Sequence, residues 1–466
     1  MDFDLFVIGG GSGGVRAARW AANKGLRVGI AEGGRLGGTC VNVGCVPKKL
    51  YFHAAHSASL FEDAESYGWR PRDDTAFARS INEQLSFDWK TLKKSVDDYL
   101  LRLNGIYEGM LDRAGVIRYQ AWAELSGEHE VTLNFEEGRR QTISARSMIL
   151  APGGKAHKPL VQGVELCGTS DDFFALTERP RSAVIIGGGY IGVEIAGIFS
   201  RLGVETTLAY RSDLPLRGFD HDLRIRIDRA LRAEMQILSK ATLRKVIALD
   251  NGLKRVYFND SEHFVDAEFI LLATGRSPNT ARLNLDTLGI KTSSERGAIV
   301  VNERYQTTLP HIYAVGDVID RMQLTPVALA EAMRVVEQLC GTPLPPLDYD
   351  LVPTTVFSHP NIATVGLSEE EALRRGRDII VYEADFKPLH QALKSNPHRV
   401  YMKMIVNAKT DRVIGCHMIG DEAGEQIQGL AVAMQAAVTK CQLDQTIGIH
   451  PTMAEEWVTM RTARAT

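Results

Sequence analysis

Two cysteines near the N-terminus, Cys40 and Cys45, stand close together among several glycines. A disulfide between them would close a loop of six residues, and loop entropy would stabilise the fold by only about 2 kcal/mol. The glycines allow another molecule to approach the backbone closely, and a helix that begins here would favour a thiolate. An exposed, locally strained disulfide is also more easily reduced than a structural one. The pair therefore predicts redox chemistry rather than a structural cross-link.

The remaining cysteines do not indicate a metal site. They stand singly along the chain, and no second Cys or His pair lies at the spacing that zinc requires. In a large cytosolic protein such cysteines are usually small buried hydrophobic residues, so we expect no bound metal. The residues concerned are Cys167, Cys340, Cys416 and Cys441.

Two glycine-rich runs indicate an internal duplication. Each follows an apolar, strand-like segment and precedes a helix-like one, and their first glycines lie 178 residues apart. Such a turn lets the backbone approach a pyrophosphate, which then rests on the N–H groups that begin the helix. Each run therefore predicts a βαβ nucleotide-binding unit. The glycines expected to line the nucleotides are Gly9, Gly11, Gly13, Gly14, Gly187, Gly189 and Gly192.

The residue that ends the second strand of each unit distinguishes the two nucleotides. In the first unit it is Glu32, 23 positions after the first glycine, and its carboxylate can accept the hydroxyls of an adenosine ribose. The same offset in the second unit leads to Tyr210, followed by Arg211 and Arg217. A missing carboxylate removes repulsion against a 2′-phosphate, and two guanidinium groups can pair with it. The second unit therefore predicts NADPH.

The rest of the chain divides around these units. Apolar strands over 147–153 and 269–275 end in similar turns, and we expect them to carry the chain from one nucleotide domain to the other and back. After Asp317 the pattern changes, and strands that alternate with helices indicate a separate α+β domain. Its expected strands are 361–365, 379–382, 400–406 and 413–419, and its expected helix is 422–439.

Composition and charge exclude several classes of partner. The chain has 466 residues and a net charge of −3, with 54 basic and 57 acidic side chains, so we expect neither nucleic acid nor an anionic membrane surface as partner. No stretch reaches the roughly 18 apolar residues that a membrane helix needs. The first strand-like segment starts at residue 3 without a basic leader, which predicts a cytoplasmic protein.

Several motifs together resemble the pyridine nucleotide–disulfide oxidoreductase family, and they occur in order along essentially the whole chain. They are the two glycine runs, Gly37-Gly38-Thr39-Cys40-Val41-Asn42-Val43-Gly44-Cys45-Val46-Pro47-Lys48-Lys49, Val315-Gly316-Asp317, Leu324-Thr325-Pro326 and His450-Pro451-Thr452. The resemblance implies an α/β fold with two Rossmann-like domains, for FAD and NADPH, and a C-terminal α+β dimerisation domain. The implied boundaries are 1–151 for the FAD domain, 152–281 for the NADPH domain, 282–348 for a central segment completing the FAD domain, and 349–466 for the dimerisation domain.

The same resemblance implies an electron path. NADPH would reduce FAD, FAD would reduce the Cys40–Cys45 disulfide, and the dithiol would reduce glutathione disulfide. By position, Cys45 is the sulfur beside the flavin and Cys40 is the interchange thiol that attacks the substrate. Lys48 and Glu194 match the ion pair beside the flavin N5, although a solvated helix surface would explain either charge alone.

His450 matches the proton donor of the family, and Glu455 matches the acid that holds it. The resemblance places this histidine in the active site of the partner subunit, so that a homodimer is needed for each complete site. A His–carboxylate pair suits proton transfer near neutral pH. A simpler interpretation is that Thr452 and Glu455 form a capping box at the start of the last helix.

Further positions match cofactor and substrate contacts of the family. Those expected to contact FAD or NADPH are Ser12, Thr39, Lys48, Tyr190, Gly275, Asp317 and Thr325. Those expected to contact glutathione disulfide are Arg19, Tyr99 and Tyr107. Because Arg16 lies near Arg19 in the sequence, this side of the site is basic, which suits an anionic substrate.

Some residues depart from the family pattern. Gly192 stands where many NADPH-dependent members have alanine, Met333 replaces a second substrate arginine, and Pro152 replaces a threonine in the first crossover turn. We expect the two arginines after Tyr210 to outweigh Gly192, because a missing methyl group cannot offset a charge-assisted phosphate contact. The stretch 73–84 is longer than is usual in the family, and its role is left open.

Two alternative activities remain open: that of a dihydrolipoamide dehydrogenase and that of a reductase for a modified glutathione disulfide. The first shares the cysteine spacing but should have an acid at the position of Tyr210. Mercuric reductase and large thioredoxin reductases are not expected, because they need a C-terminal cysteine pair. A flavoprotein that only binds a partner would not be expected to retain every residue of the catalytic set.

Overall fold

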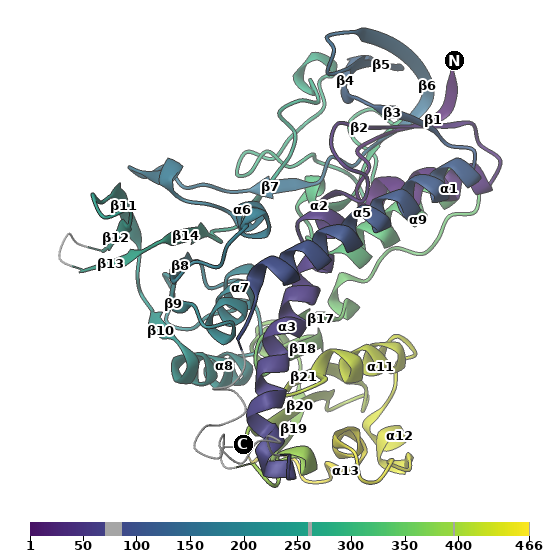
Figure 1. The fold of residues 1–466 in the computed structure, drawn as a ribbon. Coiled ribbons are helices and arrows are strands. Elements are labelled where there is room, and N and C mark those ends of the chain that lie inside the picture. Colours follow the sequence, from purple (N-terminus) through teal and green to yellow (C-terminus); the bar gives the residue numbers. More distant parts are fainter. Residues whose placement is uncertain (70–85, 260–262, 395–396, 466) are drawn as a thin grey trace.

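The computed structural model describes residues 1–69, 86–259, 263–394 and 397–465 (Figure 1). The stretch 73–84, noted above for its length, lies outside these residues. The described chain forms two α/β units and a third, C-terminal unit, which Figure 1 shows at its lower right. This is the α/β architecture with a separate α+β domain that the sequence predicts.

The first unit is built on the parallel sheet predicted around the first glycine run. Leu5, Phe6 and Val7 are fully buried, as expected for an apolar strand in a covered parallel sheet. The parallel order is β3-β2-β1-β6-β16, and β5 and β4 continue from β6 as antiparallel strands. The strands are β1 (Phe3–Ile8), β2 (Val28–Glu32), β3 (Ile117–Gln120), β4 (Trp122–Gly127), β5 (Glu130–Asn134), β6 (Arg140–Leu150) and β16 (Ile312–Ala314).

The helices of this unit bring distant parts of the chain together. α1 packs against α9 from the far end of the unit, and α3 runs from α2 down to the C-terminal unit (Figure 1). With 20 residues, α3 spans about 30 Å. Among the described helices, none combines the length and the apolar character needed to cross a membrane. The bounds are α1 (Ser12–Asn23), α2 (Gly38–Asn42), α3 (Cys45–Ala64), α5 (Trp89–Arg113) and α9 (Thr325–Leu339).

The second unit repeats the arrangement around the second glycine run. Its parallel sheet has the order β10-β9-β8-β14, and an antiparallel sheet of β11, β12 and β13 lies beside it. The strands are β8 (Ser182–Ile186), β9 (Glu205–Ala209), β10 (Gln236–Leu238), β11 (Leu243–Ala248), β12 (Lys254–Phe258), β13 (His263–Ala267) and β14 (Phe269–Leu272). The helices are α6 (Ser170–Ala175), α7 (Tyr190–Arg201) and α8 (His221–Glu234).

The two passages between these units lie side by side. The chain leaves the first sheet after β6 and returns after β14, as the two apolar strands predict. β7 (Gly154–Ala156) on the outward passage pairs antiparallel with β15 (Arg276–Pro278) on the return. The nucleotide units are therefore joined by a two-stranded ribbon.

The C-terminal unit is an antiparallel sheet in the order β17-β18-β21-β20-β19, with α11 packed on β18 and β21. The predicted helix 422–439 is too long: α11 ends at Gln435, Ala437 has φ +58°, and Thr439 caps the next helix. The strands are β17 (Thr354–Val356), β18 (Ile362–Gly366), β19 (Ile379–Phe386), β20 (Val400–Asn407) and β21 (Val413–Ile419). The helices are α10 (Glu369–Arg374), α11 (Ala423–Gln435), α12 (Lys440–Gln445) and α13 (Glu456–Thr459).

Candidate active site

The two cysteines lie on adjoining helices that begin against the first glycine run. Cys40 belongs to α2, and Cys45 is the first residue of α3. The Gly37 N–H donates to the Gly10 carbonyl at 2.8 Å, and a Cβ on Gly38 would lie 2.7 Å from the Gly11 Cα. Only glycine permits this approach. The glycines that crowd the cysteine motif therefore fix the dithiol against the start of α1.

The two sulfurs are free thiols in this structure and differ in acidity. A hydrogen bond from Cys40, with smaller contributions from Thr325 and the Lys48 charge, lowers the pKa of Cys45 to about 6. The same bond, together with burial, raises the pKa of Cys40. Thr325, the first residue of α9, has its Oγ1 3.6 Å from the Cys45 Sγ. Cys45 is therefore the more acidic of the two thiols.

An ion pair connects the cysteine helix to the second nucleotide unit. The Lys48 Nζ lies 2.8 Å from the Glu194 Oε1, and their side chains are 14% and 4% exposed. The same Glu194 oxygen accepts the Phe357 backbone N–H at 2.8 Å. The Lys48 ammonium also lies 4.0 Å from the centre of the Phe357 ring. The structure thus brings together two charges that stand 146 positions apart in the sequence.

The first glycine run fits a dinucleotide such as FAD. A Cβ on Gly14 would lie 1.8 Å from the Gly9 carbonyl oxygen, so these glycines let β1 and α1 pack closely. Gly11, the N-cap of α1, makes no side-chain cap, which leaves amides of the first turn available to a pyrophosphate. Glu32 ends β2, where its carboxylate accepts the Gly10 N–H at 2.6 Å and the Gly34 N–H at 2.7 Å. These bonds fix a carboxylate where a ribose would lie.

A second carboxyl group, Asp317, lies beyond the end of β16. Burial raises its pKa, and the neighbouring Arg276 opposes that rise. The Arg276 Nε lies 3.6 Å from the Asp317 Oδ2, and the arginine also donates to the Gly154 carbonyl at 2.6 Å. Sequence reasoning missed Arg276, although it directly follows the crossover glycine Gly275, which has φ +116°. The other predicted FAD contacts, Ser12 and Thr39, lie at the start of α1 and in α2.

The second glycine run has the same local geometry as the first. A Cβ on Gly192 would lie 1.9 Å from the Gly187 carbonyl oxygen, whereas one on Gly189 would meet no atom within 4 Å. Gly192 therefore has a packing role equivalent to that of Gly14, and its lack of a methyl group follows from close helix–strand contact. Gly189 faces open space that a pyrophosphate could occupy. Tyr190, the first residue of α7, is 40% exposed.

The end of β9 presents cations rather than a carboxylate. Tyr210 is buried, and its hydroxyl donates to the Asp228 Oδ1 at 2.5 Å. Arg211 and Arg217 are exposed, and neither makes an ion pair within the part of the chain that the structure describes. The Leu216 N–H donates to the Gly188 carbonyl at 2.7 Å, which holds the arginine loop beside the glycine turn. This geometry suits a 2′-phosphate.

The predicted substrate residues gather on α1 and α5. Tyr107 of α5 is close enough to Cys40, Arg16 and Arg19 for their charges to affect its pKa, which burial raises. The Arg19 Nη1 lies 3.2 Å from the Met110 sulfur. Tyr99 lies two turns before Tyr107 and is 39% exposed. Arginine and tyrosine side chains therefore adjoin the Cys40 side of the dithiol, while Met333 is half-buried in α9.

His450 lies away from the cysteines of its own chain. Its Nδ1 is 2.9 Å from the Glu455 Oε2, and the imidazole is 80% exposed. The alternative capping box does not form, because Glu455 faces His450 and the Thr452 hydroxyl donates to the Ile449 carbonyl. The segment between α12 and α13 belongs to the C-terminal unit at the lower right of Figure 1, whereas α2 lies at the upper end of α3 in the first unit. One chain alone does not place His450 beside Cys40.

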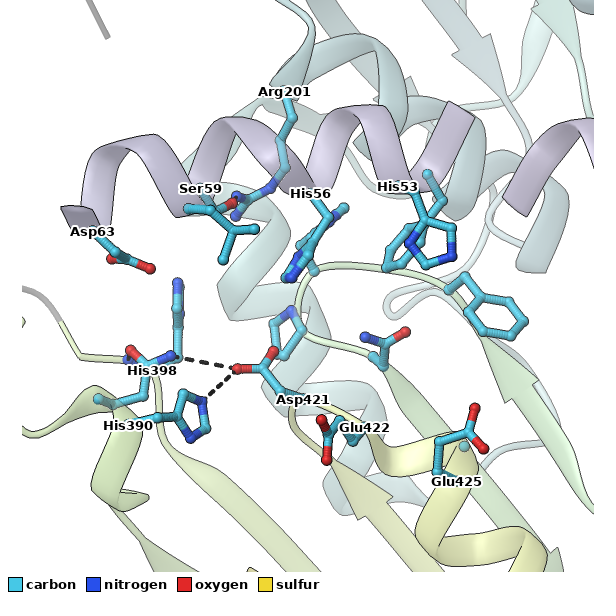
Figure 2. A pocket seen from close by; sticks show the side chains of 18 of the residues that line it. His53, His56, Ser59, Asp63, Arg201, His390, His398, Asp421, Glu422 and Glu425 are labelled. Atoms are coloured by element: carbon cyan, nitrogen blue, oxygen red, sulfur yellow. Dashed lines mark hydrogen bonds and ion pairs between the residues drawn. The ribbon is translucent and has the colours of Figure 1, made fainter. Parts of the chain in front are cut away.

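A separate cavity of about 760 Å³ lies along α3, from Lys49 to Asp63. Figure 2 shows His53 and His56 on α3 and, on the other side of the cavity, His390 and Asp421, which are bonded at 2.8 Å. None of the predicted site residues lines this cavity. Among the described residues, no group of His, Cys, Asp and Glu side chains could hold a metal ion.

Comparison with known proteins gives matches along nearly the whole chain. A family described as pyridine nucleotide-disulphide oxidoreductase matches residues 3–332, and its dimerisation domain matches residues 352–461. A glutathione reductase of Burkholderia cepacia is 40% identical over 99% of both chains. One of Nostoc sp. (strain PCC 7120) is 39% identical over 99% of this chain and all of its own. A chloroplastic/mitochondrial glutathione reductase of Pisum sativum is 39% identical over 99% of this chain and 82% of its own.

Proposed function

Because the chain belongs to the pyridine nucleotide-disulphide oxidoreductase family, we propose that it reduces glutathione disulfide to two molecules of glutathione. Its cofactors are FAD and NADPH, and it is a homodimer. The observation that carries the proposed chemistry is the placement of Cys40 and Cys45 on adjoining helices against the first glycine run, where the pKa of Cys45 is lowered and that of Cys40 is raised. Dihydrolipoamide dehydrogenase activity is not favoured, because Tyr210 and two arginines stand where that enzyme should have an acid.

Lys48 and Glu194 support the transfer of reducing equivalents between the cofactors. When bound, FAD would supply the hydride and electron-pair chemistry that connects NADPH to the Cys40–Cys45 disulfide. The buried Lys48 ammonium, held by Glu194, provides a fixed positive charge beside Cys45. This charge stabilises the Cys45 thiolate as it forms.

The dithiol then reduces the substrate by two thiol–disulfide exchanges. Deprotonated Cys40 attacks one sulfur of glutathione disulfide, so that the substrate S–S bond breaks, a mixed disulfide forms and one glutathione leaves. The Cys45 thiolate next attacks the Cys40 sulfur, which releases the second glutathione and restores the Cys40–Cys45 disulfide. Each leaving thiolate takes up one proton, so two electrons and two protons convert one substrate disulfide to two thiols.

We assign the proton transfers to His450 of the partner subunit. The His450 Nδ1–H donates a hydrogen bond to the Glu455 carboxylate. The Nε2 of the same imidazole then takes the Cys40 proton and returns it to a leaving glutathione. The high exposure of His450 and its distance from the cysteines of its own chain support a site shared across the dimer.

The remaining predicted contacts keep their proposed roles. For FAD these are Gly9, Gly11, Ser12, Gly13, Gly14, Glu32, Thr39, Asp317 and Thr325; for NADPH they are Gly187, Gly189, Tyr190, Gly192, Arg211, Arg217 and Gly275; for the substrate they are Arg19, Tyr99 and Tyr107. The boundaries near 151, 281 and 348 and a cytoplasmic location without membrane attachment are part of the same proposal.

The activity is tested by following NADPH absorbance with three acceptors: glutathione disulfide, lipoamide and trypanothione disulfide. We expect turnover with glutathione disulfide and NADPH, and little turnover with the other two acceptors. Turnover only with lipoamide and NADH would contradict the proposal. Modified forms of glutathione disulfide added to the same assay identify the preferred thiol.

A further inference from the structure

A buried carboxylate lies behind the Asp317 turn and has no part in the chemistry above. Glu331, in the second turn of α9, is only 1% exposed. Its Oε2 accepts the Gly316 N–H at 2.7 Å, and its Oε1 accepts the Tyr349 hydroxyl at 2.7 Å. A buried carboxylate is costly unless hydrogen bonds satisfy it, and its position depends on those bonds. The two contacts therefore define what Glu331 does in the fold.

The first contact fixes the backbone just ahead of Asp317. The Val315 N–H still pairs with the Leu150 carbonyl of β6 at 3.1 Å, so the chain follows the sheet up to this residue. Gly316 then bends the chain with φ +77°, and a Cβ there would lie 3.2 Å from the Ala328 Cβ. Its N–H has left the sheet and points to Glu331. The direction in which Asp317 leaves the turn therefore depends on that hydrogen bond.

The second contact reaches the start of the C-terminal unit. Tyr349 begins a short helix, Tyr349–Leu351, just ahead of β17. Its hydroxyl lies 3.3 Å from the Tyr305 hydroxyl, and the Arg321 Nη1 lies 3.5 Å away. The groups that face Glu331 are thus two phenols, one cation and the Asp317 carboxyl group. Through Tyr349, Glu331 links the turn to the unit that forms the dimer.

We propose that Glu331 is a positioning residue for FAD: it holds the Gly316–Asp317 turn in place and is itself held by Tyr349. The inference rests on the proposed function, because it takes Asp317 as an FAD contact. Glu331 does not touch the reacting atoms. It keeps the Gly316–Asp317 turn ordered before FAD binds, so that the Asp317 carboxyl group already has the orientation needed for the cofactor.

The test compares Glu331 with a second buried carboxylate on the same helix. Glu337 is 7% exposed and joins α9 to α1, where it accepts the Trp20 indole N–H at 2.7 Å and the Lys24 ammonium at 3.1 Å. The rate at which FAD leaves diluted holoenzyme is read from the fluorescence of the free cofactor. We expect Glu331→Leu to speed release about tenfold to a hundredfold, because a buried N–H loses its charged acceptor. Glu337→Leu should lower the melting temperature but leave release near the wild-type rate.

Conservative variants separate positioning from general destabilisation. Glu331→Gln should release FAD more slowly than Glu331→Leu, because the amide oxygen still accepts the Gly316 N–H. Tyr349→Phe should speed FAD release, and this test holds even if Glu331→Leu does not fold. The double variant Glu331→Gln/Tyr349→Phe should raise the release rate by less than the product of the two separate fold-increases. Suppose that Asp317→Asn releases FAD faster than wild type. Equal release rates for wild type, Glu331→Gln and Tyr349→Phe would then overturn the inference. If Asp317→Asn also has no effect, the proposed FAD contact itself is wrong.

Discussion

Cys40 and Cys45 have the same side chain, but their surroundings shift the two pKa values in opposite directions. Cys45 begins α3, accepts a hydrogen bond from Cys40 and lies near the Lys48 charge, all of which stabilise a thiolate. Cys40 is the donor of that bond and is partly buried, so it keeps its proton. This difference agrees with the distinct roles that we propose for the two sulfurs.

The acidity of Cys45 gives a pH prediction. Its folded pKa of about 6 lies below the ordinary value of 9.0, so its contribution to the stability of the reduced form is complete above pH 9.0 and is lost as pH falls through about 6. The thiolate absorbance of the reduced holoenzyme should therefore show one transition near pH 6. Cys40→Ala should raise this midpoint, because it removes the largest stabilising contact.

The exposed thiol Cys441 of α12 provides the control for this titration. Cys441→Ser should leave the midpoint unchanged, whereas Cys45→Ser should abolish the transition. A midpoint that is the same in wild type and Cys40→Ala would show that the bond between the two sulfurs does not set the acidity.

The Lys48–Glu194 pair gives a stability prediction. Lys48→Met leaves a nearly buried carboxylate without its cation, which should destabilise the folded chain by about 3 kcal/mol and lower the melting temperature. The double variant Lys48→Met/Glu194→Gln should be more stable than Lys48→Met, because the unpaired charge is removed. The matched control is Lys90→Met, since Lys90 and its partner Glu178 are 70% and 73% exposed. The melting temperature of Lys90→Met should equal that of wild type. If Lys48→Met and Lys90→Met lower the melting temperature equally, burial of the Lys48–Glu194 pair does not explain the loss.

Arg211 and Arg217 give a prediction about cofactor choice. Replacing both by methionine removes two charge-assisted contacts to a 2′-phosphate and should raise the KM for NADPH about tenfold to a hundredfold. The KM for NADH should change little, because NADH has no such phosphate. Arg244→Met, at an exposed position on β11, serves as the control and should affect neither constant. Equal increases for both cofactors would contradict the assignment.

At the scale of elements, glycines decide how closely helices approach strands. Gly14 and Gly192 occupy equivalent positions in α1 and α7, and a Cβ on either would lie less than 2 Å from a carbonyl oxygen of the preceding turn. The departure of Gly192 from the alanine of many NADPH-dependent relatives is therefore explained by packing. We expect the choice of cofactor to depend on the loop after β9 instead.

Three glycines of the second unit give an element-scale prediction. Gly192→Ala should displace α7 from β8 and destabilise the fold by about 1–3 kcal/mol. Gly189→Ala should keep the wild-type melting temperature but raise the KM for NADPH, because its Cβ enters space intended for the pyrophosphate. Gly197 lies on the same helix, and an added Cβ there would have one neighbour within 4 Å, the His359 Nδ1 at 3.9 Å. Gly197→Ala should therefore neither lower the melting temperature nor raise the KM for NADPH. A lower melting temperature for Gly189→Ala would show that the protein itself, rather than the pyrophosphate, fills the space beside Gly189.

At the scale of the whole molecule, one chain holds only part of the proposed site. Cys45 begins α3 in the first unit, whereas His450 lies in the C-terminal unit, between α12 and α13. The histidine is exposed in one chain, and the chain is a homodimer. In the proposed mechanism, a second copy therefore brings the proton donor to Cys40.

Mixed dimers test this arrangement. Cys40→Ser and His450→Ala should each be inactive as homodimers, while a heterodimer of the two combines an intact Cys40 with an intact His450 at one of its two sites. A random mixture should regain about a quarter of wild-type activity, because half of the dimers are mixed and each has one complete site. A purified heterodimer without activity would place the proton donor elsewhere.

Features that depend on neighbouring residues could be predicted from the sequence. The cysteine pair, the two glycine turns, Glu32 and the arginines after Tyr210 all lie within single βαβ segments, where chain connectivity fixes their relations. The apolar strands and the two passages between the nucleotide units could be predicted for the same reason. The helix predicted over 422–439 was too long, because Ala437 adopts a left-handed conformation that the local sequence does not predict.

Only the tertiary structure decided contacts between residues far apart in the sequence. Resemblance suggested the pairing of Lys48 with Glu194, but its distance and burial follow from the packing of α3 on α7. Arg276 beside Asp317, and Glu331 between Gly316 and Tyr349, could not be predicted, because neither spacing nor periodicity relates these positions. Local sequence therefore determined which groups could do the chemistry, and packing determined their acidity, their orientation and the distant residues that they contact.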